Sequence, residues 1–145
     1  MIDASLTEEV RIALTKAPSV RKLSDEEAGA AVDAVAKRWE IDTDANWWWE
    51  GLSAEHHAIP YDDDGLDKLA QIAPTDARAH LVITDDELPP WPVLTGTVGD
   101  LIGVLRELPF CEFFLVDPKH EWIVFDTHES QLVVAGTPPV GAALQ

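Results

Sequence analysis

The chain has 145 residues, 46% of them hydrophobic, and its 27 Asp and Glu against 10 Lys and Arg give a formal net charge of -17. A chain of this length fits one domain with a substantial core. Its charge disfavours nucleic acids and anionic membranes as partners, because binding to phosphate backbones depends on Lys and Arg. A basic protein or a metal ion suits it better, although a high net charge also serves solubility alone.

No targeting or membrane segment is recognisable in the sequence. The N-terminus lacks the basic and apolar regions of a signal peptide, and no apolar run approaches the ~20 residues that span a bilayer. We therefore expect a soluble, cytoplasmic protein. Its one cysteine, Cys111, cannot form an internal disulfide and lies in an apolar run, where a buried thiol is expected.

Two helices are predicted at the start of the chain, each opened by a capping box of the S-x-x-E type. Ser5 and Glu8 begin the first helix, and Pro18 ends it. Ser24 and Glu27 begin the second. The apolar positions of the second helix recur at helical spacing and predict a buried stripe: Ala28, Ala31, Val32, Val35, Ala36 and Trp39.

Strands and two more helices follow. The segment 88–92 is predicted to be a loop, because its prolines do not fit a sheet interior. Thr97 is expected to cap the last helix, and Trp122 to lie in the core. In chain order the predicted elements are strand 55–61, helix 65–73, strand 79–84, helix 98–108, and strands 110–116, 121–127 and 131–135.

These elements predict an α+β fold. An antiparallel sheet of about five strands ends in a meander, and two N-terminal helices and two further helices pack on it. We expect a single domain over residues 1–136, with a helical N-terminal part at 1–42 and a core at 45–136. Residues 137–145 are expected to form a loose tail.

Four stretches occur in an order that resembles a family of small bacterial proteins of unassigned function. They are NWWWEGL from residue 46, DDDGLDKLAQIAP from 62, GTVGDLIGVL from 96, and EFFLVDPKHEWIVFDTHESQLVVAG from 112. The resemblance covers residues 45–136. It implies a tryptophan-rich segment before a helix and a final strand pair with a Glu-Trp and a histidine turn. That turn often carries two adjacent histidines in the family, whereas here Glu129 follows His128. By analogy, small acidic bacterial proteins of this kind are often toxin-neutralising immunity proteins.

Three consecutive tryptophans, Trp47, Trp48 and Trp49, cannot all share one face of a helix or strand. One interpretation is that they fill the junction between the second helix and the sheet, with one ring partly exposed. The other is that a ring forms an exposed anchor for a partner, together with Trp91 in the proline-rich loop, because tryptophan is enriched at interface hot spots. We assign Trp48 and Trp91 to partner binding on the second interpretation.

Two acidic runs lie beside turns at the ends of elements: Asp62, Asp63 and Asp64, and Asp85, Asp86 and Glu87. Such runs are commonly solvated, and Asp62 or Asp63 as a helix N-cap explains the first without any function. The first run does not match a calcium-binding EF-hand, because the alternating ligands and the terminal Glu are absent. The alternative is that both runs belong to an acidic face that meets a basic partner.

The histidines give only a weak signal for metal or acid–base chemistry. His56 and His57 are adjacent on a strand and point to opposite faces, and no spacing matches a zinc-binding pattern. Asp126 and His128 share a face of their strand, where the carboxylate could orient the imidazole. In the absence of a catalytic motif we predict no catalytic residue and no cofactor, with a metal site at Asp126 and His128 as the alternative.

The leading hypothesis is a non-enzymatic, intracellular module that binds a basic protein, most concretely an immunity protein that neutralises a toxin. Two alternatives from other classes are kept open. One is a small metal-assisted hydrolase that uses Asp126, His128 and a strand histidine, and the other is a structural or regulatory subunit. The sequence does not identify the partner or the oligomeric state.

Overall fold

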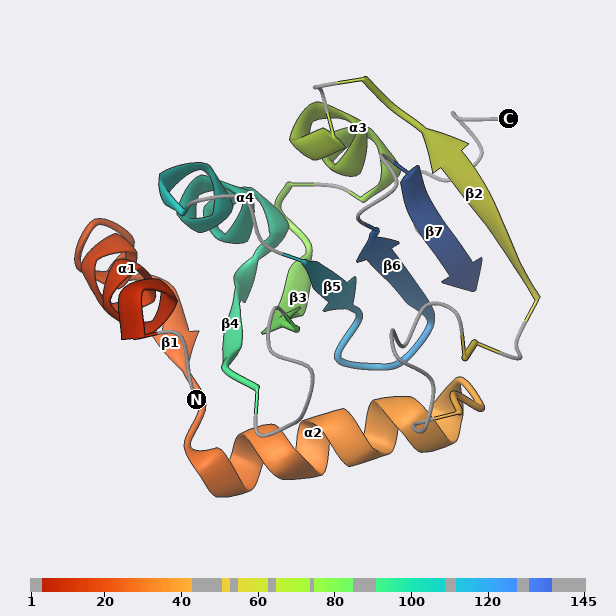
Figure 1. The fold of residues 1–145 in the computed structure, drawn as a ribbon, viewed down its shortest axis with the longest axis horizontal. Helices are drawn as coiled ribbons and strands as arrows, with labels where there is room; N and C mark the ends of the chain where they lie inside the picture. The colour runs from red at the N-terminus through yellow and green to blue at the C-terminus, as the bar shows by residue number, and fades with distance from the viewer. Residues whose placement is uncertain are drawn as a thin grey trace.

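Seven strands form one sheet in the order β1-β4-β3-β5-β6-β7-β2, and all neighbours pair antiparallel (Figure 1). This computed structural model describes residues 4–42, 51–52, 55–62, 65–73, 75–84, 91–108, 112–127 and 131–136, with side chains from residue 9 on. The strands are β1 (Arg21–Lys22), β2 (His56–Pro60), β3 (Arg78–Ile83), β4 (Val93–Thr97), β5 (Phe113–Val116), β6 (Trp122–Asp126) and β7 (Gln131–Gly136). The helices are α1 (Ala4–Thr15), α2 (Asp25–Arg38), α3 (Gly65–Ile72) and α4 (Val98–Glu107).

Helices cover both faces of this sheet. Figure 1 shows α2 on one side, apart from α1, α3 and α4. The buried side chains divide in the same way, because those of α1, α3 and α4 share one apolar cluster and those of α2 share another. The strands between them alternate, so that Leu81 and Leu115 face the first cluster and Val82 and Phe114 the second. We call these the α4 face and the α2 face.

The α+β class and the four helices are confirmed, but the expected sheet of about five strands is wrong. The five predicted strands all occur, and β1 and β4 were missed. β1 has only two residues, which pair with Leu94 and Thr95 of β4. β4 follows a proline-rich segment and contains Gly96, and both features weaken the local strand pattern. The predicted meander is present as β5, β6 and β7, and β2 adds an edge strand to it.

Local capping chemistry was predicted correctly at two helices. The Ser24 side chain accepts a hydrogen bond from the Glu27 amide, and the Glu27 side chain accepts one from the Ser24 amide. Thr97 caps α4 by accepting from the Asp100 amide. The capping box of α1 falls on side chains outside the described residues. Trp39 and Trp122 lie in the core as expected.

Among the residues that the structure describes, no helix combines the length and the apolar character needed to cross a membrane.

Candidate functional site

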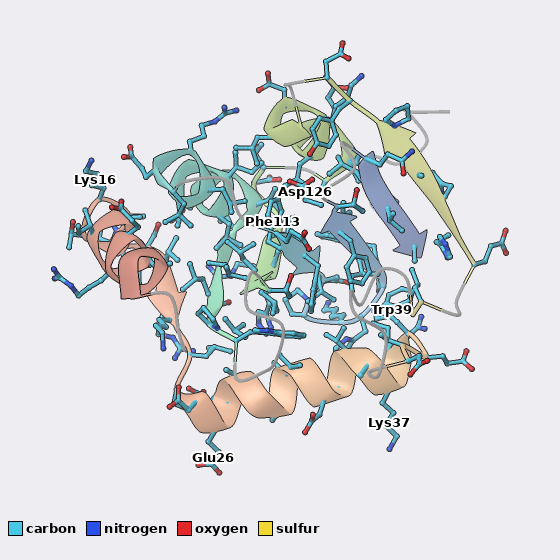
Figure 2. All side chains as sticks on the ribbon, viewed as in Figure 1. Lys16, Glu26, Lys37, Trp39, Phe113 and Asp126 are labelled. Atoms are coloured by element: carbon cyan, nitrogen blue, oxygen red, sulfur yellow. The ribbon has the colours of Figure 1, made fainter. Side chains whose placement is uncertain are left out.

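Asp126 is the predicted polar site residue that lies buried in the described structure. It ends β6 and points to the α4 face, where it pairs in register with Phe113 of β5 and Leu132 of β7. Figure 2 shows Asp126 within the body of the fold, and its residue is only 9% exposed. The hydroxyl of Tyr61, which directly follows β2, donates a 2.6 Å hydrogen bond to its Oδ1.

The position of Tyr61 depends on the glycine that begins α3. A Cβ atom at Gly65 would lie 2.9 Å from the Tyr61 ring, closer than side chains tolerate. The absence of a side chain at Gly65 therefore lets the ring lie against the start of α3, with its hydroxyl aimed at β6. One hydrogen bond thus joins the end of the edge strand to an inner strand, and the Tyr61 ring that donates it lies against the first residue of α3.

Burial shifts the acidity of both partners. Desolvation raises the pKa of Asp126 from 3.8 to about 6, the hydrogen bond from Tyr61 opposes that shift, and the charge of Glu112 adds to it. The pKa of Tyr61 is raised well above its ordinary value by desolvation, and further by the hydrogen bond and charge of Asp126. Tyr61 therefore stays a donor, whereas Asp126 changes charge near neutral pH.

The strand histidines do not gather around Asp126. His80 lies on β3 and shares a register row with Val116 and Ile123, which belong to the α2 face. His57 shares the α4 face with Asp126, but it is exposed on the edge strand, two strands away. The partner predicted in the Asp126–His128 pair lies outside the described residues. Within the described ranges, no group of three or more His, Cys, Asp or Glu could hold a metal ion.

The structure places Trp91 in the core, which corrects its assignment as an exposed anchor. Trp91 is 5% exposed and belongs to the apolar cluster of the α2 face. The adjacent Pro92 carbonyl accepts a hydrogen bond from the Ile83 amide, so this segment continues the pairing of β3. Although its prolines predict a loop, the ring of Trp91 covers part of the sheet.

Few of the remaining partner-binding predictions fall on described residues. Asp62 is exposed just beyond β2. The others lie outside the described ranges, and for them the assignment stays a prediction: Trp48, Asp63, Asp64, Asp85, Asp86 and Glu87.

A family model described as "Family of unknown function (DUF6756)" matches residues 17–142. The chain belongs to the DUF6756 family. No curated protein and no solved structure matches it. The DUF6756 match confirms membership in a family of unassigned function, and it starts well before the 45–136 stretch on which the resemblance rested. Among the described elements, α1 precedes the match, while all seven strands and the other three helices fall within it.

Sequence reasoning missed a group of basic side chains within the DUF6756 region. Arg21, Arg78 and His80 come from β1 and β3, and His120 comes from the turn between β5 and β6. The sheet register places Arg21, Arg78 and His80 at one end of the α2 face, and His120 lies close enough for its charge to act on His80. No local motif marks them, because the chain between Arg21 and Arg78 contains two helices and an edge strand.

Proposed function

We propose that this protein is a binding module for a basic protein, most concretely an immunity protein that neutralises a cationic toxin. The observation that carries the proposal is the charge count. If every one of the 10 Lys and Arg paired with its own carboxylate, 17 of the 27 Asp and Glu would still lack such a partner. A surface with this excess attracts cationic proteins and repels polyanions.

The described surface supports this proposal at α2. Glu26 and Asp33 lie on the solvent side of the helix, and Glu40 is exposed just beyond its end. Figure 2 shows Glu26 pointing away from the fold. The ion pairs between described residues engage other carboxylates, namely Glu27, Asp67 and Glu107. We define Glu26, Asp33 and Glu40 as the outer acidic stripe of α2.

The proposed mechanism has two stages. Long-range attraction first raises the rate of encounter with the basic partner, and short-range packing then slows its release. The outer acidic stripe of α2 and Asp62 contribute to the first stage. We propose that the predicted acidic runs add to the long-range attraction and that Trp48 acts as the anchor of the short-range packing. Trp91 is not part of the proposed binding surface, because its ring is buried.

Affinity capture tests the proposal. The full-length chain is immobilised and exposed to cytosol of the source cells, in parallel with a triple variant Glu26→Gln, Asp33→Gln, Glu40→Gln. Lys37→Gln, an exposed substitution on the same helix, is the matched control. We expect the wild type and the control to retain one basic protein that the triple variant retains in a smaller amount. Co-expression should also relieve any toxicity of that protein. Retention of an acidic protein, or equal retention by all three chains, would contradict the proposal.

A metal-assisted hydrolase is the second candidate function, and the observation that favours it is the pKa of Asp126 near 6. A carboxyl group with that pKa can exchange a proton near neutral pH, as a general acid or base must. Its test is elemental analysis of protein purified without chelators, together with hydrolysis of simple ester and phosphodiester substrates. Bound zinc, manganese or iron and an activity lost in Asp126→Asn would favour this candidate over the binding module.

A further inference from the structure

Against the acidic background, one end of the α2 face carries a concentration of basic side chains. We define the cationic cluster as Arg21, Arg78, His80 and His120. Arg21 and His80 both pair with Thr95 of β4, from opposite sides, so all three side chains lie in one row on one face. Arg78 shares that face, two residues from His80 along β3. The cluster therefore spans three neighbouring strands.

The side chains of Arg21, Arg78 and His80 are close enough to contact one small ligand together. Adjacent strands lie about 4.8 Å apart and residues rise by about 3.3 Å, so the Cα atoms of Arg21 and His80 are about 10 Å apart and those of Arg78 and His80 about 7 Å. An arginine side chain is long enough to cross these gaps. The two guanidinium groups and the imidazole of His80 can therefore reach a common point above Thr95.

His120 completes the cluster from the turn that closes β5 and β6. Its amide donates a 2.8 Å hydrogen bond to the Asp117 carbonyl, and its backbone takes a φ of 59°, a left-handed conformation that is uncommon for residues other than glycine. The ring nitrogen Nδ1 is buried and has no hydrogen-bond partner in the described part of the chain.

Carboxylates also act on three residues of the cluster: Asp117 on His80, Glu27 on Arg21 and Asp100 on Arg78. Desolvation lowers the pKa of His80, and the charges of His120, Arg78 and Arg21 lower it further, against a smaller opposing effect of Asp117. The Asp117 carboxylate already accepts from the Glu121 amide. Arg21 makes a long 3.7 Å ion pair with Glu27 of α2. The charge of Arg78 helps to lower the pKa of Asp100 at the start of α4, but the side chains of Arg78 and His80 make no hydrogen bond or ion pair with another described residue.

We propose that the cationic cluster is a binding site for a small ligand that carries a phosphate group. Two guanidinium groups, two imidazoles and the nearby Thr95 offer more donors than one carboxylate can accept, whereas a tetrahedral phosphate has oxygens directed to several sides. The ligand is small, because the net charge of -17 repels a long polyanion such as a nucleic acid. The site is independent of the proposed protein partner, since it uses the opposite sign of charge.

The probe is inorganic phosphate, titrated at low ionic strength into the full-length chain while two-dimensional NMR follows the histidine side chains. We expect saturable shifts at His80 and His120, with smaller changes at His56 and His57 on the distant edge strand. A bound dianion should also raise the pKa of His80, since it favours the charged imidazole. Shifts that grow linearly without saturation, or that are equal at all four histidines, would overturn the proposal.

Three variants distinguish a specific binding site from general charge attraction. Arg78→Gln removes an exposed side chain of the cluster, and we expect it to weaken phosphate binding about tenfold or more. Lys37→Gln removes the same charge from the outer side of α2 and should leave binding unchanged. Equal weakening by both would show non-specific attraction and overturn the site. His80→Gln, which keeps a polar side chain, should weaken binding and abolish its increase on acidification.

The affinities of other anions, compared with that of inorganic phosphate, identify the chemical class of the ligand. Tighter binding of glycerol phosphate than of inorganic phosphate would support a phosphate monoester, and the reverse order would support free phosphate. Acetate or malonate binding as tightly as phosphate would overturn the assignment to phosphate chemistry. A single-stranded oligonucleotide that binds more tightly than inorganic phosphate would overturn the restriction to small ligands.

Discussion

The Tyr61 hydroxyl donates a 2.6 Å hydrogen bond to Oδ1 of Asp126, across 65 positions of sequence. This bond joins the end of edge strand β2 to the end of β6 on the α4 face. Desolvation raises the pKa of Asp126 to about 6. The acceptor of this hydrogen bond is therefore a charged carboxylate at neutral pH and a neutral carboxylic acid below about pH 6. The strength of this link is therefore expected to depend on pH.

Tyr61→Phe should destabilise the fold more at about pH 7.5 than at about pH 4.5, because a hydrogen bond to a charged group contributes about 1.5–3 kcal/mol and a neutral one about 0.5–1.5 kcal/mol. Removal of the bond should also raise the pKa of Asp126 further, since the bond opposes the effect of desolvation. Urea unfolding at the two pH values measures the difference. In an Asp126→Asn background the pH dependence of the Tyr61→Phe effect should vanish, and its persistence would mean that another group titrates.

Asp126→Asn should stabilise the protein above pH 6. The pKa of Asp126 is raised in the folded state, from 3.8 to about 6, so its contribution to stability is fully present below pH 3.8 and is lost as the pH rises through about 6. Asparagine does not ionise, so the variant does not lose this stability, and its side-chain oxygen still accepts the hydrogen bond from the Tyr61 hydroxyl. The gain should reach at most about 3 kcal/mol, and less where water screens the carboxylate. Thermal unfolding from about pH 4 to about pH 8 measures it. A variant less stable than wild type above pH 6 would contradict the assigned pKa.

Gly136→Ala should be strongly destabilising, by about 2–4 kcal/mol. Gly136 has a φ of 80°, and an added Cβ would collide with the Glu121 carbonyl and lie 2.6 Å from the Trp39 ring. The backbone atoms involved cannot move without disturbing the pairing of β6 and β7. Denaturant unfolding gives the loss.

Gly29→Ala is the matched control for that substitution. Gly29 lies exposed within α2, and no atom lies within 4 Å of a Cβ added there. Alanine is the better helix former, so this variant should gain about 0.5–1 kcal/mol. A loss of stability at Gly29, or none at Gly136, would contradict the described packing of α2 and β7.

Much of the fold was predictable because its signals are local. The capping box at Ser24, the cap at Thr97 and the apolar run of β5 each lie within a few residues of sequence. β1 was not predictable, because two residues become a strand only when β4 lies beside them. The burial of Trp91 was missed for the same reason, since its proline neighbours specify a loop and only the sheet beneath it specifies a core position.

The candidate sites were less predictable than the fold. Asp126 stood out through its position in a strand, but its partner Tyr61 shares no local pattern with it. The cationic cluster depends on the order β1-β4-β3, which places Arg21 beside a strand more than fifty residues further along the chain. A register of that kind comes from long-range pairing, which residue spacing alone does not encode.

The most direct test of the central claim, that an acidic surface recruits a basic protein, is the association rate constant of the captured partner at two salt concentrations. Raising the ionic strength from about 0.01 M to about 0.1 M shortens the Debye length from about 30 Å to about 10 Å. We expect a steep fall in the association rate of the wild type and a smaller fall for the triple variant Glu26→Gln, Asp33→Gln, Glu40→Gln, with dissociation rates little changed. An association rate that does not depend on salt, or that is the same for the wild type and the triple variant, would contradict the claim.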